Sequence, residues 1–132
     1  MPDTTSREEL LDTIEKEATA LEKEYHGCSR CVLIPLQKNL GIGNSAVARA
    51  SAPLAGGIAL TGETCGALMG GLLAVGLVMA DDNVEDNQAF LDTMAAGFRF
   101  HRRFQKAFEA TTCRDLQTAT AGKYYSMANP EE

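Results

Sequence analysis

A glycine-rich apolar run occupies the middle of the chain. Residues 65–80 read CGALMGGLLAVGLVMA and contain no charged side chain. A helix that is apolar on every side lies either at the centre of a bundle or across a membrane. A membrane span needs about 20 apolar residues, whereas this run is shorter and is bounded by Glu63 and by Asp81-Asp82. The run therefore predicts a buried central helix.

Three glycines weaken this predicted helix. Gly66, Gly70 and Gly71 each cost about 1 kcal/mol relative to alanine in a helix interior. Close contact with a neighbouring helix would offset that cost, and so would space for a bulky group beside the backbone. Of these two explanations, we expect close helix packing.

Helical periodicity predicts two helices before the central one. Ser6 and Glu9 match a capping box that opens an amphipathic helix, which ends near Gly27. The segment 28–41 is also helical in pattern, although it contains Pro35. Either the proline kinks this helix just after the Cys28/Cys31 pair, or it lies in the first helical turn and the pair lies in the preceding loop.

Further helices are predicted on both sides of the run. A short helix covers residues 44–54, and a long one covers residues 81–110 with Asp82 or Asn83 as its cap. From Cys113 we expect a turn that can continue as a short helix, followed by a polar tail. The predicted inward stripe of the long helix consists of Asn87, Phe90, Leu91, Met94, Phe98, His101, Phe104 and Phe108.

These elements predict one all-α domain over residues 1–132, a compact bundle of four to five helices around the glycine-rich helix. The net charge of −6 at pH 7 argues against partners that need a basic surface, namely nucleic acid and anionic membranes. The N-terminus lacks the basic and apolar regions of a signal peptide. We therefore expect a cytoplasmic protein, in which clustered cysteines more often serve metal or redox chemistry than structural disulfides.

Four cysteines carry the candidate chemistry, namely Cys28, Cys31, Cys65 and Cys113. Each is predicted at the edge of a helix, and the dipoles of the helices at Cys28 and Cys65 would lower the thiol pKa. Four thiolates could hold an iron–sulfur cluster or a structural zinc ion. Alternatively, the Cys28/Cys31 pair could exchange with a disulfide, with one of the other two as resolving thiol. Two or more could also be small buried apolar residues.

The residues around Cys65 resemble the central motif of a known family. The stretch Gly62-Glu63-Thr64-Cys65-Gly66-Ala67-Leu68-Met69-Gly70-Gly71 is similar to that of the redox-active protein family named for its C_GCAxxG_C_C cysteine pattern. Cys28 resembles the cysteine of that family's N-terminal helix, and Cys113 resembles its third cysteine. The resemblance covers roughly residues 20–117.

This resemblance implies a helical protein that is redox-active or binds a cluster. A related domain in split-Soret cytochromes favours iron–sulfur chemistry. The family usually has a fourth cysteine in a C-terminal helix, where this chain has Tyr124-Tyr125 and no cysteine, whereas Cys31 is additional to the pattern. Either Cys31 replaces the fourth ligand, or the site is remodelled, or a three-cysteine site is completed across a dimer.

The leading hypothesis is electron transfer or redox sensing through an iron–sulfur cluster. Its ligands would be Cys28, Cys31, Cys65 and Cys113, with Gly66 and Gly70 giving room and backbone N–H donors. We expect a redox partner protein, and a homodimer formed through small-residue and Phe-rich surfaces. The alternatives are a thiol–disulfide oxidoreductase with Cys28 as the attacking thiolate, and a zinc-stabilised interaction module.

Overall fold

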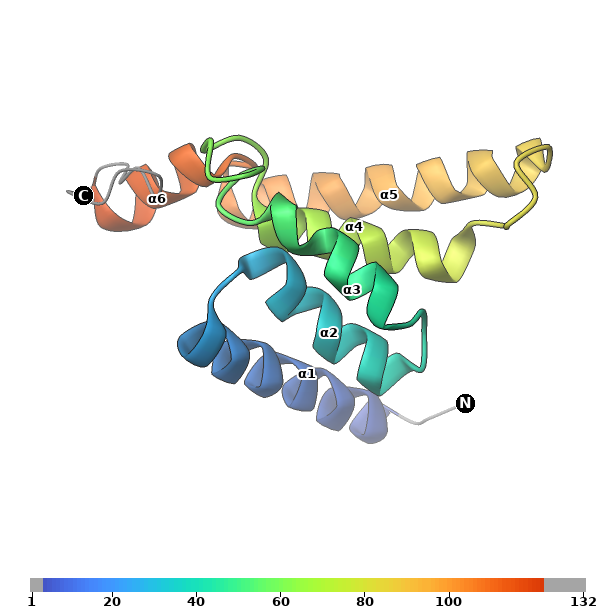
Figure 1. Cartoon of the computed structure of the whole chain (residues 1–132), viewed down its shortest axis with the longest axis horizontal. Coiled ribbons are helices and arrows are strands. Elements are labelled where there is room, and N and C mark those ends of the chain that lie inside the picture. Colours follow the sequence, from blue (N-terminus) through green and yellow to red (C-terminus); the bar gives the residue numbers. More distant parts are fainter. Residues whose placement is uncertain (1–3, 123–132) are drawn as a thin grey trace.

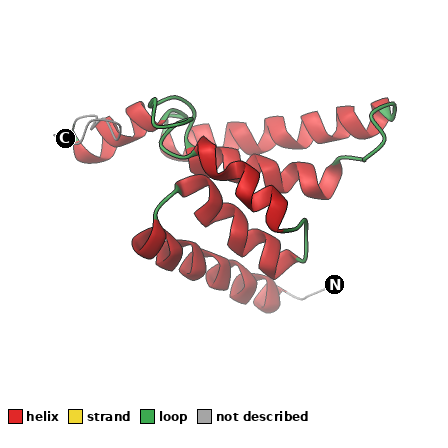
Figure 2. Cartoon of the chain, in the orientation of Figure 1, coloured by secondary structure: helices red, strands yellow, loops and turns green. Residues whose placement is uncertain are grey.

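The computed structural model describes residues 4–122, and these residues form an all-helical domain (Figures 1 and 2). This confirms the predicted all-α class. Two short helices, α3 and α6, accompany four longer ones, so the bundle has more helices than the four to five predicted. The elements are α1 (Thr4–Tyr25), α2 (Cys28–Leu40), α3 (Ser45–Ser51), the short 3-10 helix η1 (Ala52–Leu54), α4 (Gly66–Met79), α5 (Asn87–Phe108) and α6 (Cys113–Ala121).

Two antiparallel helix pairs make up most of the fold, as Figure 1 shows. Helix α1 packs against α2, and α4 packs against both α2 and α5, so α4 holds the central position that its sequence predicts. Helices α2 and α4 begin at the same end of the molecule, where the chain also turns from α5 into α6. Within residues 4–122, no helix is both long and apolar enough to cross a membrane.

The glycines of α4 serve close helix packing. A Cβ atom on Gly70 would lie 2.5 Å from the carbonyl oxygen of Ser29 in α2. A Cβ on Gly66 would lie 3.1 Å from the amide nitrogen of Ser29, and one on Gly71 would clash with the ring of Phe100 in α5. The missing side chains thus let α4 contact the backbone of α2 and the aromatic ring of α5, as predicted.

Few side chains are fully buried in the interior. Of the described residues, Leu33 and Leu68 are the largest with essentially no exposure, one from α2 and one from α4. The hydroxyl of Ser29 is also buried, and it donates a hydrogen bond of 2.8 Å to the carbonyl oxygen of Ser51. This bond satisfies a polar group that would otherwise weaken the contact between α2 and α3.

Two predicted helix boundaries are wrong, and the structure decides between the two alternatives for Pro35. The first helix begins at Thr4, so Ser6 lies inside it rather than at its cap. Pro35 lies in the interior of α2 and the cysteine pair lies in the first turn of the same helix, as in the first alternative, so the pair is not in a preceding loop. Helix α5 begins at Asn87, because the side chain of Asp86 accepts a hydrogen bond from the amide of Ala89. The predicted tail beyond Gly122 lies outside the described residues.

The predicted inward stripe of the long helix is also wrong in large part. Phe90, Leu91, Met94, Phe98 and Phe108 are each at least 50% exposed. Helix α5 instead turns a less apolar face toward α4, on which Phe100 contacts Gly71. Gly97 also faces Leu72, so α5 contacts α4 through residues that lie between the predicted ones, and most of the predicted apolar side chains are left on the outer side.

We expect Gly70→Ala to destabilise the fold by about 1–3 kcal/mol, the usual cost of overpacking, because the neighbouring atom belongs to the backbone of Ser29. Gly76→Ala is the matched control in the same helix, because its Cβ would meet no described atom within 4 Å. There we expect a gain of about 0.5–1 kcal/mol from helix propensity. Urea denaturation followed by circular dichroism measures the free energy of unfolding of both variants. Equal changes for Gly70→Ala and Gly76→Ala would contradict the close contact of α2 with α4.

Candidate functional site

Every cysteine lies at the start of a helix, as predicted. Cys28 is the first residue of α2 and Cys31 follows one turn later. Cys65 is the N-cap residue of α4, and Cys113 is the first residue of α6. All four are free thiols, of which Cys31 and Cys113 are buried and the other two are partly exposed. The helix starts therefore bring the thiols to one end of the molecule.

A tight turn positions the Cys28/Cys31 pair. His26 and Gly27 both have positive φ angles, of 61° and 98°, and only these two residues separate the end of α1 from the start of α2. The carbonyl oxygen of His26 accepts a hydrogen bond from the Arg30 guanidinium at 3.2 Å and one from the Cys31 thiol at 3.3 Å. Cys31 is only 3% exposed. Its proton is thus held by a backbone acceptor, while Cys28 keeps access to solvent.

The two cysteines of this pair line one open pocket. Its volume is about 510 Å³, and its lining comes from α1, α2 and α4: Ala18, Thr19, Glu22, Lys23, Cys28, Cys31, Val32 and Ala67. The pocket gives a small molecule or a protruding side chain a route to Cys28.

Backbone pairing places Cys65 beside Cys113. Thr64 and Thr112 form an isolated antiparallel bridge. On either side of it, the amide of Cys65 donates to the carbonyl of Thr111 at 2.8 Å, and the amide of Cys113 donates to the carbonyl of Glu63 at 2.7 Å. These two bonds join the start of α4 to the start of α6.

A left-handed segment packs against the same bridge. Residues 56–60 all have φ between 50° and 72°, and three of them, Ile58, Ala59 and Leu60, are not glycine. This conformation costs non-glycine residues roughly 1–2 kcal/mol each. A Cβ on Gly57 would lie 2.7 Å from the Cβ of Cys113, and the carbonyl of Gly57 accepts a 2.8 Å bond from the amide of Glu63. The segment thus wraps around Cys113 and shields it.

Burial raises the pKa of the Cys31 thiol, and the nearby negative charge of Glu22 raises it further. Oε2 of Glu22 is itself shielded from solvent. Sequence analysis missed Glu22, because the carboxylate comes from another helix and forms no motif with the cysteine. Cys31 is therefore a neutral thiol at neutral pH.

Burial also raises the pKa of the Cys65 thiol. The amide groups of Leu68 and Ala67 at the start of α4 act in the opposite direction, but the negative charges that Cys28 and Cys113 can carry add to the increase. Cys65 makes no capping hydrogen bond through its sulfur. The predicted lowering of the Cys65 pKa by the helix dipole is therefore wrong, because desolvation outweighs the helix terminus.

The four cysteines are linked as successive neighbours. Cys28 lies close enough to influence the titration of both Cys31 and Cys65, and Cys65 is influenced in turn by Cys113. Among residues 4–122, no three His, Cys, Asp or Glu side chains are arranged to hold a metal ion. A Cβ on Gly66 would lie 2.5 Å from the sulfur of Cys28, and one on Gly70 would meet the backbone of Ser29.

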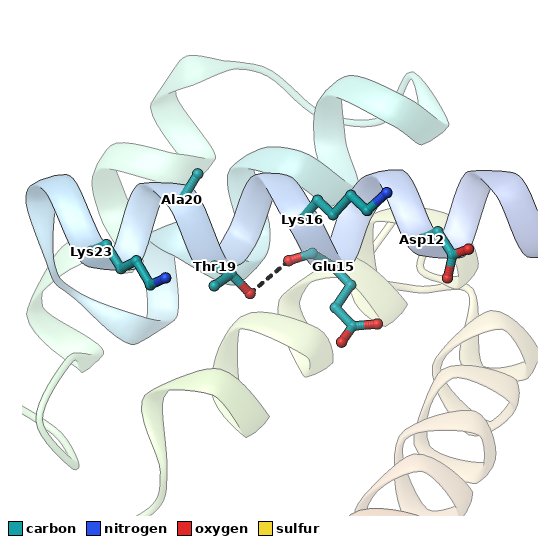
Figure 3. Close-up of a pocket in the computed structure, with 6 residues that line it drawn as sticks. All are labelled: Asp12, Glu15, Lys16, Thr19, Ala20 and Lys23. Atoms are coloured by element: carbon teal, nitrogen blue, oxygen red, sulfur yellow. Dashed lines mark hydrogen bonds between the residues drawn. The ribbon is translucent and has the colours of Figure 1, made fainter.

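A second pocket, drawn in Figure 3, lies on α1 alone. Its six lining residues are Asp12, Glu15, Lys16, Thr19, Ala20 and Lys23. The hydrogen bond drawn there joins the hydroxyl of Thr19 to the carbonyl of Glu15 at 2.9 Å and lies within the helix. No cysteine lines this pocket.

Comparison with known proteins agrees with the cysteine arrangement. No curated protein and no solved structure shows a significant match to the chain. The family model described as "Putative redox-active protein (C_GCAxxG_C_C)" matches residues 26–132, which include all four cysteines. On this match, the chain belongs to the C_GCAxxG_C_C family.

Proposed function

We propose that the chain performs thiol–disulfide exchange through Cys28 and Cys31. The observation that carries this proposal is the pairing of a partly exposed thiol with a buried one, a single helical turn apart, on one open pocket. The two thiols of such a pair have different roles in exchange. The partly exposed thiol attacks the partner's disulfide, and the buried thiol then resolves the mixed disulfide. The family description supports redox activity of this general kind.

The exchange proceeds in two displacement steps. The Cys28 thiolate attacks one sulfur of a partner disulfide, which forms a mixed disulfide and releases one partner thiolate. Cys31 then loses its proton and attacks the Cys28 sulfur, which forms the Cys28–Cys31 disulfide and releases the second partner thiolate. Two electrons pass from the dithiol to the partner, and both released thiolates take up protons from water or from the protein.

A cysteine-ligated iron–sulfur cluster is the second candidate. What favours it is that α2 and α6 begin at Cys28 and Cys113 and that Cys65 is the N-cap residue of α4. Helix N-termini direct N–H groups toward anionic sulfur. All four cysteines would then be ligands of the cluster. A redox partner protein is part of both candidates.

We expect Cys31→Ser to trap a mixed disulfide. With oxidised glutathione, this variant should retain one glutathione on Cys28, because the second displacement is lost, whereas wild type should release it and form an internal disulfide. Intact-protein mass spectrometry distinguishes these products. Cys113→Ser is the control and should behave as wild type, since Cys113 lies under the 56–60 segment. Absence of any adduct on Cys31→Ser would contradict the exchange proposal.

We also expect the thiols to be alkylated in a defined order as pH rises. Cys28 should react first, whereas Cys31 and Cys65 should react slowly until the pH exceeds the ordinary cysteine range near 8.5, because their pKa values are raised and their thiolate fraction at neutral pH is low. Glu22→Gln should accelerate the alkylation of Cys31 and of no other cysteine. The increase should be less than about tenfold, which is the effect of one pKa unit. Peptide mapping after timed alkylation measures each rate. Equal neutral-pH rates at Cys28 and Cys31 would refute this division of roles.

Metal analysis separates the two candidates. For thiol–disulfide exchange, we expect anaerobically purified protein to be colourless and to contain no stoichiometric iron or acid-labile sulfide, before and after cluster reconstitution. A broad visible absorption band with stoichiometric iron and sulfide would instead establish the cluster. Stoichiometric zinc would identify a structural site.

A further inference from the structure

A row of five residues marks the outward face of α5. Asp86, Phe90, Met94, Phe98 and Arg102 follow one another at intervals of four residues, so they form one ridge along the helix surface. The three apolar members are 58%, 56% and 63% exposed. Helix α5 has no buried residue at all. We call these five residues the α5 ridge.

The α5 ridge is not covered by the described part of the chain. Phe100, on a different face of α5, meets Gly71 of α4, and Gly97 faces Leu72. Met94 and Phe98 instead border an open groove of about 400 Å³ between α4 and α5, whose lining is almost entirely apolar. Exposed apolar side chains that form one continuous row, rather than scattered single residues, are typical of an interaction site. A partner of α5 must therefore be apolar at its centre.

The order of residues in the α5 ridge indicates which partner fits. The ridge is symmetric about Met94, with a phenylalanine on each side and opposite charges at its two ends. A second α5 in antiparallel orientation would place Phe90 against Phe98 of the second copy, and Asp86 against Arg102 of the second copy. Such self-complementarity is what a symmetric two-fold interface requires. A parallel arrangement would oppose like charges at both ends.

Two contacts keep the charged ends of the ridge in place. The guanidinium of Arg102 lies 5.7 Å from the centre of the Phe98 ring, so its charge stays beside the apolar centre. Asp86 is held at the helix start by its 3.0 Å bond from the amide of Ala89. We infer that the chain forms a symmetric dimer through antiparallel packing of the α5 ridges, with Met94 on the two-fold axis.

The test is the molar mass in solution. Light scattering coupled to size-exclusion chromatography should give twice the 14.1 kDa chain mass for wild type. Met94→Arg should give the chain mass, because it brings two like charges together on the axis. Leu11→Arg, at a residue 54% exposed on α1, is the matched control and should remain dimeric. Circular dichroism establishes whether each variant is folded. If Met94→Arg is not folded, the milder substitution Met94→Ala takes its place.

Charge reversal tests the antiparallel pairing. Arg102→Glu should raise the dimer dissociation constant at least tenfold, with a larger effect at low salt, because it opposes Asp86 of the second copy. Arg103→Glu removes the same charge from a neighbouring position outside the ridge and should change the constant far less. Any one of three results would overturn the inference. The two charge reversals could have equal effects, the folded Met94→Arg variant could remain dimeric, or the wild type could have a mass of 14.1 kDa at every concentration. The last result would leave the face to a different protein.

Discussion

The contact between the glycines of α4 and the backbone of α2 determines the geometry of the whole site. Gly66 and Gly70 leave no side chain between the two helices, so the start of α4 lies against Ser29 and against the sulfur of Cys28. Because both helices begin at this contact, their first residues become neighbours, and Cys28 lies close to Cys65. A larger residue at either glycine would separate the helices and with them the cysteines.

Backbone hydrogen bonds outside the helices hold Cys113 beside Cys65. The bridge between Thr64 and Thr112 joins the start of α6 to the start of α4, and the left-handed segment 56–60 closes over it. Backbone strain of this kind persists only where the surrounding structure compensates for it. Here the compensation is a set of backbone hydrogen bonds that shields Cys113, whereas Cys28 and Cys65 stay partly exposed.

The sequence was sufficient for the helical class, the central helix and the position of each cysteine at a helix start, because hydrophobic periodicity and turn residues determine these locally. Three features depended on tertiary structure. The raised pKa of Cys65 reflects desolvation, which helix position does not reveal. The positive φ of Ile58 is unfavourable for a β-branched residue and is set by its surroundings. The outward direction of Phe98 could not be predicted, since the periodic pattern identifies an apolar face but not what that face contacts.

The thiol pocket and the α5 ridge use different helices, and this separation bears on how they can work together. The pocket is lined from α1, α2 and α4, with no residue of α5, whereas the ridge belongs to α5 and its preceding cap. A second copy packed on the ridge would therefore leave the entrance to Cys28 open. Because α4 contacts both α2 and α5, such a dimer would stabilise the helix that positions Cys65 without obstructing a redox partner. Dimerisation would then support the thiol site through the rigidity of α4 rather than by supplying residues to it.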